Sequence, residues 1–300
     1  MIMNEYKALG LKSSRCCELC DIPRSSYYYS ASHGNPGRMP STHTQLKNGK
    51  MIENGKVCQE IISILDHPFV DYGYLKVTHK LRQSCEMIIN PKKVYRLMKE
   101  SKLLSKKVGE KQNHKKRVSG WKVNVSRPFE LIEIDIKYIY VKGDHRHYYM
   151  LNLLDCYSWK LLSYRISASI KKEDVIALLK SVFALYGYPE KITLRSDNGS
   201  QFIAKDVAEY IKEAEITHEF THVATPQENG YVECFHSILA RFLRKRGDFE
   251  NFFELETVLK NWTEFYNEER LHKGCGYKTP NMVMREYYDK NRKNVGKNAA

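Results

Sequence analysis

The chain has 300 residues, a length that suggests about two domains at the usual ~150 residues per domain. No run of apolar residues approaches the ~18 to 20 needed to span a bilayer. The opening segment MIMNEYKALG lacks the apolar stretch of a secretory signal, and the eight irregularly placed cysteines do not form a disulfide framework. These features exclude the membrane and secreted classes and predict a cytoplasmic protein.

The formal net charge of +14 is concentrated in the N-terminal part of the chain. Residues 1–120 hold 22 Lys and Arg against 10 Asp and Glu, whereas residues 121–300 hold 27 against 25. A basic region before a nearly neutral one suggests a nucleic-acid-binding module joined to a second domain, although a solvated basic face gives the same surplus. The densest basic stretch, Lys102–Gly120, lacks apolar periodicity and predicts a linker that lies along phosphates.

A short helical unit is predicted first, over Ser13–Ser30, and it ends in a basic, tyrosine-rich segment suited to the DNA backbone. Cys17, Cys20 and His33 fit the first three ligand positions of a zinc finger, C-x2-C-x12-H. The next histidine, His43, lies too far along the chain, and the intervening sequence has no long helical stripe. Small core cysteines are therefore favoured over a zinc site.

Three short helices follow, over residues 57–65, 74–83 and 91–102, and they fit the packing of a helix-turn-helix. The third begins favourably, with Pro91 after Asn90. It combines apolar packing residues with a crowd of basic ones, so we predict that it contacts DNA; a merely solvated basic helix is the alternative. Its basic residues are Lys92, Lys93, Arg96 and Lys99.

At residue 130 the period changes from helical to strand-like. Residues 130–141 (ELIEIDIKYIYV), 147–158 and 159–167 predict three strands of an antiparallel meander. A helix closed by Gly187 comes next, and then a short strand that runs into a turn at Asp197. A further helix, strand and helix complete the pattern, which predicts a mixed α/β sheet.

The stretch TPQENGYVECFHSI, residues 225–238, places two acids at the start of the last of these helices. Thr225 and Glu228 form a capping box, with Pro226 at the first helical position, so Glu228 has a structural role. Glu233 lies beside the apolar stripe of the helix, where it either pairs with a nearby arginine or has a chemical role. The stripe consists of Val232, Phe235, Leu239 and Phe242.

Two aspartates stand out upstream. Asp135 interrupts an apolar strand, which is unusual because strands disfavour Asp and a buried carboxylate costs several kcal/mol unless it is paired or bound to metal. Asp197 stands before Asn-Gly at a strand end, where ordinary turn chemistry is the alternative. Glu133 shares the face of Asp135 and is its local rival as a metal ligand.

Thirty-five residues separate Asp197 from Glu233, with Asp135 well upstream, which is a D, D-35-E spacing. With EIDIKYI, LRSDNGSQF and ATPQENGYVECFHSIL around these acids, and FYNEERLHKGCGYKTP at residues 265–280, the chain resembles the retroviral-integrase superfamily. Within it, the chain is similar to the second-frame (OrfB-type) transposases of bacterial insertion sequences. HPFVDYGYLKVTHKL and PKKVYRLMKESKLL look like the helix-turn-helix segment of that group, so the resemblance covers nearly the whole chain.

The resemblance implies an α/β fold, with a ribonuclease-H-like mixed-sheet core preceded by an all-α helix-turn-helix region. It also implies five consecutive segments. They are an N-terminal helical segment with a partial helix-turn-helix (1–50), a helix-turn-helix DNA-binding region (51–104), a basic linker (105–125), the integrase catalytic core (126–247) and a C-terminal helical extension (248–300).

By the same resemblance, Asp135, Asp197 and Glu233 meet at one end of the sheet and hold two divalent ions. All-oxygen ligation suits Mg²⁺, with Mn²⁺ as a substitute, because hard cations neutralise carboxylates that would otherwise repel one another. Two metals roughly 3.5 to 4 Å apart support in-line displacement at phosphorus. The implied reaction is cleavage at the element ends, followed by attack of the freed 3′-hydroxyl on a phosphodiester.

The chain departs from the family pattern after the glutamate. Many relatives carry a basic residue seven positions on, where this chain has Ala240; Arg241 and Arg244 follow as candidate DNA contacts. His236 either contacts DNA or is packed and hydrogen-bonded. Asn198, Gly199 and Gln201 either shape the active-site loop or form an ordinary turn.

The implied partners are the terminal inverted repeats of the element and target DNA, bound by a homo-oligomer. An upstream-frame DNA-binding protein, or a frameshift fusion with it, is a further expected partner; a membrane is not. Two other functions stay open. One is a catalytically inactive helix-turn-helix regulator with an integrase-like domain, and the other is a nuclease of the same fold that does not join strands.

Overall fold

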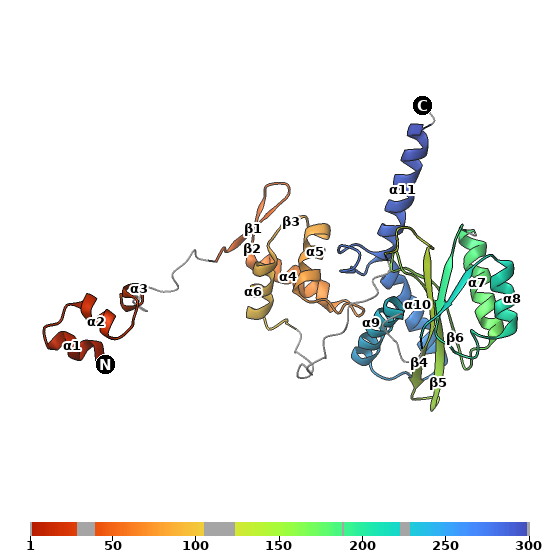
Figure 1. The fold of residues 1–300 in the computed structure, drawn as a ribbon, viewed down its shortest axis with the longest axis horizontal. Coiled ribbons are helices and arrows are strands. Elements are labelled where there is room, and N and C mark those ends of the chain that lie inside the picture. Colours follow the sequence, from red (N-terminus) through yellow and green to blue (C-terminus); the bar gives the residue numbers. More distant parts are fainter. Residues whose placement is uncertain (1, 29–39, 105–123, 188, 223–228, 299–300) are drawn as a thin grey trace. The chain divides into compact units, whose positions relative to one another are not determined.

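The computed structural model describes residues 2–28, 40–104, 124–187, 189–222 and 229–298 (Figure 1). The chain divides into two compact units, Met1–Thr42 and His43–Ala300. None of the helices in these described stretches has the length and apolar character that crossing a bilayer requires.

The smaller unit is helical. Cys16 and Cys17 are buried in it, and Lys7 lies over the ring of Tyr27 at 5.0 Å. His33, the third ligand of the zinc-finger alternative, falls outside the described residues, and all eight cysteines of the chain are free thiols. The helices of this unit are α1 (Ile2–Ala8), α2 (Ser13–Leu19) and α3 (Arg24–Tyr27).

Residues 43–104 form the three predicted helices together with a small sheet that the sequence pattern did not reveal. The sheet has the strand order β2-β1-β3. Asn90 caps the third helix, because its side chain accepts a hydrogen bond from the backbone N–H of Lys92 at 2.8 Å. The elements are β1 (His43–Leu46), β2 (Met51–Glu53), α4 (Asn54–Asp66), α5 (Tyr74–Ser84), β3 (Met87–Ile88) and α6 (Pro91–Glu100).

A five-stranded sheet with the order β6-β5-β4-β7-β8 supports the rest of the larger unit. The first three strands form the predicted antiparallel meander, whereas β7 runs parallel to β4, and β8 runs parallel to β7. This order confirms the predicted ribonuclease-H-like α/β class. The strands are β4 (Leu131–Val141), β5 (Arg146–Asp155), β6 (Leu161–Ser167), β7 (Thr193–Ser196) and β8 (Thr217–Phe220).

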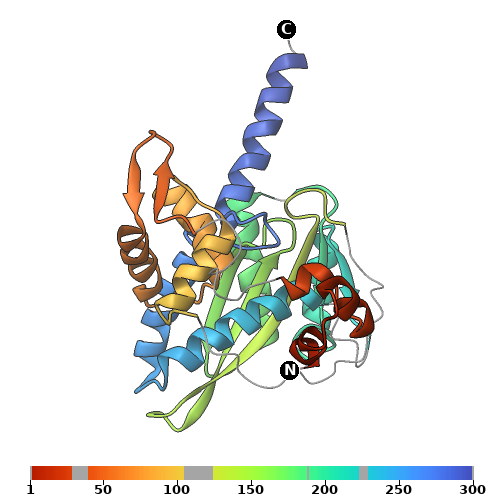
Figure 2. The ribbon, with the colours of Figure 1, turned by 90° about the vertical axis from the view of Figure 1, so that its left-hand side faces the viewer.

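Helices cover both faces of this sheet. On one face lie α7 (Lys172–Tyr186) and α8 (Lys205–Glu213), and on the other α9 (Gly230–Arg246) and α10 (Phe252–Glu268), as Figures 1 and 2 show. Gly187, with a φ of 77°, ends α7 where the sequence predicted.

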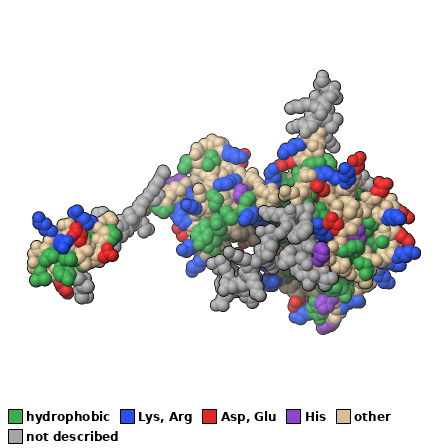
Figure 3. All heavy atoms as spheres, viewed as in Figure 1, with side chains coloured by type: hydrophobic (Ala, Val, Ile, Leu, Met, Phe, Trp, Pro, Cys, Tyr) green, Lys and Arg blue, Asp and Glu red, His purple; other side chains and the backbone are tan. Residues whose placement is uncertain are grey.

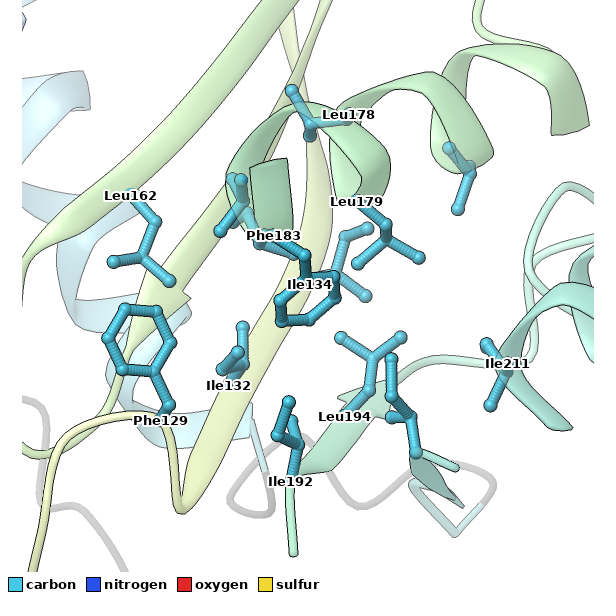
Figure 4. Close-up of a cluster of buried hydrophobic side chains, with 14 of the residues drawn as sticks. Phe129, Ile132, Ile134, Leu162, Leu178, Leu179, Phe183, Ile192, Leu194 and Ile211 are labelled. Carbon is cyan, nitrogen blue, oxygen red and sulfur yellow. The ribbon is translucent and has the colours of Figure 1, made fainter. Parts of the chain in front are cut away.

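Strand β4 supplies side chains to a hydrophobic core on each face because successive residues point to opposite sides. Ile132 and Ile134 pack with Leu179 and Phe183 of α7, as Figure 4 shows. Ile139 and Val141 belong to the other core, which also contains residues of α9 and α10. The predicted apolar stripe of α9 is confirmed, since Val232, Phe235, Leu239 and Phe242 are all buried in that core.

The segment between α4 and α5 contacts the last turn of α10 and the residues after it. The Tyr72 hydroxyl donates to the carbonyl of Glu269 at 3.4 Å and accepts from the backbone N–H of Leu271 at 2.9 Å. Phe265 and Leu271 share a hydrophobic core with α4, α5 and α6. Residues 43–104 are therefore joined to the C-terminal part of the larger unit, which ends in α11 (Pro280–Asn298).

Candidate active site

Parallel pairing of β4 with β7 brings Asp135 and Asp197 to the same level of the sheet. Glu133 is the register partner of Arg195, and each aspartate lies two residues farther along its own chain. Asp197 follows the last residue of β7 and is exposed, whereas Asp135 lies within β4 with its side chain 24 % exposed. Asp197, at the carboxyl end of β7, thus lies beside Asp135 of β4.

Glu233 reaches this region from the first turn of α9, which packs against β4 and β5. Its neighbour Val232 is fully buried, whereas Glu233 itself is exposed. Glu233 therefore lies beside the buried stripe of α9, as predicted, with its side chain facing outward. The predicted capping box of Thr225, Pro226 and Glu228 lies outside the described residues. In the described part, α9 begins at Gly230 with Asn229 as its N-cap.

The pKa of Asp135 reflects the charges of the other two acids. Burial raises the pKa of Asp135 to about 6, the hydrogen bond from the Ile136 N–H opposes that rise, and the charges of Asp197 and Glu233 add to it. Like charges raise a carboxyl pKa only when they lie near it. The three acids of the D, D-35-E pattern therefore come from β4, the end of β7 and α9 to one edge of the sheet.

The ring of His236 lies beside Oδ2 of Asp135. It is 9 % exposed, its Nδ1 lies 3.5 Å from Asp135 Oδ2, and its Nε2 lies 2.9 Å from Nδ2 of Asn152. The Asn152 amide also donates to the carbonyl of Met150 at 2.9 Å, so Nε2 accepts and Nδ1 carries the proton toward Asp135. Burial, helped by the charge of Lys137, lowers the pKa of His236 to about 3 and keeps the ring neutral.

This arrangement fits the packed, hydrogen-bonded interpretation of His236 rather than a DNA contact. The sequence did not single out Asn152, although a polar residue inside the apolar run YYMLNLLD is a signal of the same kind as Asp135.

Glu133, the rival of Asp135, is fully buried and accepts a hydrogen bond from the backbone N–H of Val232 at 2.7 Å. Burial raises its pKa to about 7, against the lowering effect of that bond and of Arg195. Since its carboxylate is engaged by the start of α9, Glu133 lacks the outward exposure of Asp197 and Glu233.

The loop after Asp197 is a tight turn. The Gly199 N–H donates to Asp197 Oδ1 at 2.9 Å, and Asn198 donates to the carbonyl of Thr221 at 2.9 Å. A Cβ on Gly199 would lie 3.0 Å from Asp197 Oδ1 and 2.3 Å from the amide nitrogen of Gln201. Phe202 anchors the loop in the core, as the ordinary-turn interpretation predicts, and the Gly199 hydrogen bond belongs to that turn.

The donor set suits a hard cation, because three carboxylates supply oxygen ligands and their mutual repulsion is relieved by positive charge. Across the described ranges, no three His, Cys, Asp or Glu side chains are arranged as a formed metal site. The fit of these residues to a hard cation such as Mg²⁺ lies in the chemistry of their three carboxylates.

The predicted DNA-contacting helix α6 has an apolar face and a basic one. Val94, Leu97 and Met98 are buried, whereas Lys92 and Lys99 are exposed. Lys93 donates to the carbonyl of His43 at 2.6 Å, and Arg96 lies 3.5 Å from Glu100. Figure 3 shows Lys and Arg side chains on the visible face of residues 43–104.

The two arginines predicted as DNA contacts on α9 differ from each other. Arg241 Nε lies 3.1 Å from Asp71 Oδ2, so this guanidinium joins α9 to the segment between α4 and α5. Arg244 is exposed in the last turn of α9. The role of Arg241 at this junction was missed because nothing in the sequence pairs residues so far apart.

Models of known families match most of the chain. A model for the integrase core domain matches residues 125–226, a second integrase core model matches residues 214–280, and a model for an HTH-like domain matches residues 56–111. Residues 125–280 therefore match an integrase core domain and residues 56–111 an HTH-like domain, an arrangement consistent with an OrfB-type insertion-sequence transposase, a DDE-type polynucleotidyl transferase.

Similar curated proteins come from bacterial insertion sequences. The chain is 26 % identical to the putative transposase InsK of insertion sequence IS150 from Escherichia coli K12, over 84 % of this chain and 86 % of that protein. It is 24 % identical to the transposase of IS629 from Shigella sonnei, over 91 % of each.

Among solved structures, the chain resembles the HTLV-2 integrase catalytic core in complex with magnesium, with 19 % identity and a TM-score of 0.43. That match covers 53 % of this chain and 97 % of the core. The simian T-cell lymphotropic virus intasome, in complex with a PP2A regulatory subunit, matches with 17 % identity and a TM-score of 0.47, over 75 % and 74 % of the two chains.

Proposed function

We propose that this chain cleaves DNA at the ends of an insertion sequence and joins the freed ends to target DNA. In the first transfer, water attacks a phosphodiester at an element end and releases a 3′-hydroxyl. In the second, that hydroxyl attacks a target phosphodiester and displaces a 3′-hydroxyl of the target. One phosphodiester is formed for each one broken in the joining step, so no energy cofactor is needed.

The single observation that carries this proposal is the convergence of Asp135, Asp197 and Glu233, from three separate elements, at one edge of the sheet. Carboxylates that lie this close together repel one another unless positive charge is bound between them. Two Mg²⁺ ions bound there would neutralise this charge, activate an attacking oxygen and stabilise a leaving one.

The side chains around the acids have supporting roles in this proposal. His236, which is hydrogen-bonded to Asn152, lies beside the carboxylate of Asp135, and the turn at Gly199 holds that of Asp197. Lys92 and Lys99 on α6, together with Arg244, would contact DNA phosphates, with Lys93, Arg96 and Arg241 partly engaged within the chain. Assembly as a homo-oligomer on DNA, and an upstream-frame partner, remain predictions.

The experiment uses DNA that carries both ends of the element next to this gene, incubated with the purified chain and Mg²⁺. Wild type is compared with Glu233→Gln, which keeps the size of the side chain and removes its charge. We expect new 3′-hydroxyl ends and joined strands with wild type. The variant should lose at least about a thousandfold in rate, on the order of 4 kcal/mol of transition-state stabilisation, while still binding the DNA.

A matched control is Glu209→Gln, because Glu209 is an exposed glutamate on α8 that is paired with Lys205 and lies on the other face of the sheet from α9. Salt-sensitive binding without cleavage by wild type, in the presence of any upstream-frame protein, would instead support the regulator. Cleavage without joining would support the nuclease.

A further inference from the structure

Glu133 is the one acid of β4 that the proposed chemistry does not use. It lies two residues before Asp135 on the same strand, and its exposed fraction is 0 %. A fully buried carboxylate costs several kcal/mol unless hydrogen bonds or opposite charges compensate it. The contacts that compensate Glu133 come from α9 and β7, which carry the other two acids, and from the Cys156 side chain.

The first contact is with α9. Gly230 is the first residue of this helix, so Tyr231 and Val232 occupy its second and third positions, whose N–H groups have no partner within the helix. The side chain of the N-cap residue, Asn229, makes no capping hydrogen bond. Glu133 Oε2 accepts from the Val232 N–H at 2.7 Å, and the Tyr231 N–H bonds to the same carboxylate.

A carboxylate from a neighbouring strand therefore does what an N-cap side chain usually does, and it also meets the positive end of the helix dipole. The next residue along α9 after Val232 is Glu233. The hydrogen bond from Val232 thus fixes the first turn of α9 relative to β4, directly before Glu233.

The second contact is with β7. Arg195 Nη1 lies 3.9 Å from Glu133 Oε1, and the two residues are register partners in the sheet. The guanidinium is itself held by Glu219 on β8, with Nη2 at 2.8 Å and Nε at 3.2 Å from Oε2. Arg195 lies two residues before Asp197, so this contact ties the end of β7 to β4 just ahead of the second acid.

We propose that Glu133 is a positioning residue that fixes Asp135, Asp197 and Glu233 relative to one another through β4, Arg195 and the first turn of α9. The inference rests on the proposed function, because it assigns Glu133 to the same three acids. The carboxylate reaches two different elements, because Oε2 accepts a hydrogen bond from the start of α9 and Oε1 faces the guanidinium of Arg195.

The experiment compares wild type with Glu133→Ala and Glu133→Gln. The Mg²⁺ concentration for half-maximal cleavage should rise at least about tenfold in the alanine variant, because the three acids no longer share one fixed geometry. Glutamine keeps an oxygen for the α9 amides, so we expect it to restore part of the Mg²⁺ response. Assays run well below the unfolding temperature of each variant.

Asp155→Asn is the matched control. Asp155 is also fully buried in this sheet, and the backbone hydrogen bonds that it accepts come from Phe129 at 2.7 Å and Ser158 at 2.8 Å, which lie outside α9 and β7. A purely structural role for Glu133 would lower the unfolding temperature as Asp155→Asn does and leave the Mg²⁺ requirement unchanged. That outcome, in a wild-type background that cleaves DNA, overturns the inference.

Hydrogen exchange of the Tyr231 and Val232 amides gives an answer that does not depend on activity. Faster exchange of these amides in Glu133→Gln and Glu133→Ala than in Asp155→Asn supports the anchoring of α9 by Glu133, and equal exchange contradicts it. If the wild-type chain does not cleave its element ends, the proposed function is wrong. The exchange result still decides whether Glu133 anchors α9.

Discussion

Two groups of charged side chains in residues 43–298 are built in opposite ways. At the junction between the α4–α5 segment and α10, negative and positive charges are paired. Asp71 forms ion pairs with Arg270, whose side chain is 2 % exposed, and with Arg241. At the sheet edge, Asp135, Asp197 and Glu233 gather charge of one sign.

The difference shows in the pKa values of the two aspartates. Burial raises the pKa of Asp71, but the charge of Arg270 and its hydrogen bonds outweigh this and hold the pKa below its usual value. Asp135 is also buried, yet its neighbours Asp197 and Glu233 push its pKa the same way as burial does, to about 6. The ion pairs at the junction hold the fold together, whereas the cluster of like charges at the sheet edge favours the binding of a cation.

The largest expected effect on stability comes from breaking the paired group. Asp71→Asn leaves the Arg270 guanidinium buried without its counter-charge, so the free energy of unfolding should fall by about 3 to 5 kcal/mol. Urea unfolding of wild type and variant measures the difference. Arg241→Ala serves as the control, because that side chain is 50 % exposed and its pair should contribute only about 0 to 1 kcal/mol. Equal losses in the two variants would contradict this account of the junction.

A second variant sharpens the comparison, because Asp71 is surrounded by three cations, Arg270, Arg241 and Lys76. Burial first, and the charge of Arg270 next, lower the pKa of Lys76 to about 8. Below pH 8 the lysine is charged in both the folded and the unfolded chain. The folded state is then destabilised by the full free energy of holding this charge in a buried site next to Arg270. As pH rises from 8 to the ordinary lysine pKa of 10.5, the unfolded chain alone holds the proton, and the cost disappears.

Lys76→Met should therefore be more stable than wild type at pH 7 by about 1 to 2 kcal/mol, after allowance for partial exposure. This advantage should shrink between pH 8 and 10.5. Unfolding midpoints measured at pH 7 and at the alkaline end test the sign, and a variant less stable than wild type at pH 7 would show that the ammonium group is needed by Asp71.

A smaller effect is expected on α6, where basic side chains are exposed rather than paired. Lys92→Ala with Lys99→Ala should weaken binding to DNA of any sequence by a factor of several, and it should lower the slope of log affinity against log salt by about 2. Fluorescence anisotropy at a series of salt concentrations measures both quantities. Lys93→Ala is the comparison, since Lys93 already donates to the carbonyl of His43; a larger loss there would reverse the assignment.

Local patterns made most of the fold predictable. The apolar stripe of α9, the Asn90 cap of α6 and the alternation of β4 all depend on residues close in sequence, and each is confirmed. The short strands β1, β2 and β3 were missed because segments of two to four residues carry little periodicity.

The sequence predicted which acids form the candidate site better than it predicted the contacts that these acids make. An Asp inside an apolar strand and the spacing of the acids are visible in the sequence, whereas the partners of Glu133, His236 and Arg241 come from elements far apart in the chain. Such contacts depend on how the helices pack on the sheet, which no local pattern encodes.

The central claim, that the three acids repel one another until a divalent cation arrives, is tested most directly by the unfolding midpoints of wild type and Asp135→Asn with and without Mg²⁺, at equal ionic strength. Without Mg²⁺ we expect the variant to be more stable by about 1 kcal/mol, the order of a short-range repulsion between unit charges in water. With Mg²⁺ at ten times its dissociation constant, wild type should gain about 1.4 kcal/mol and the variant much less. Equal responses to Mg²⁺, or a wild type that is the more stable protein without it, would contradict the account.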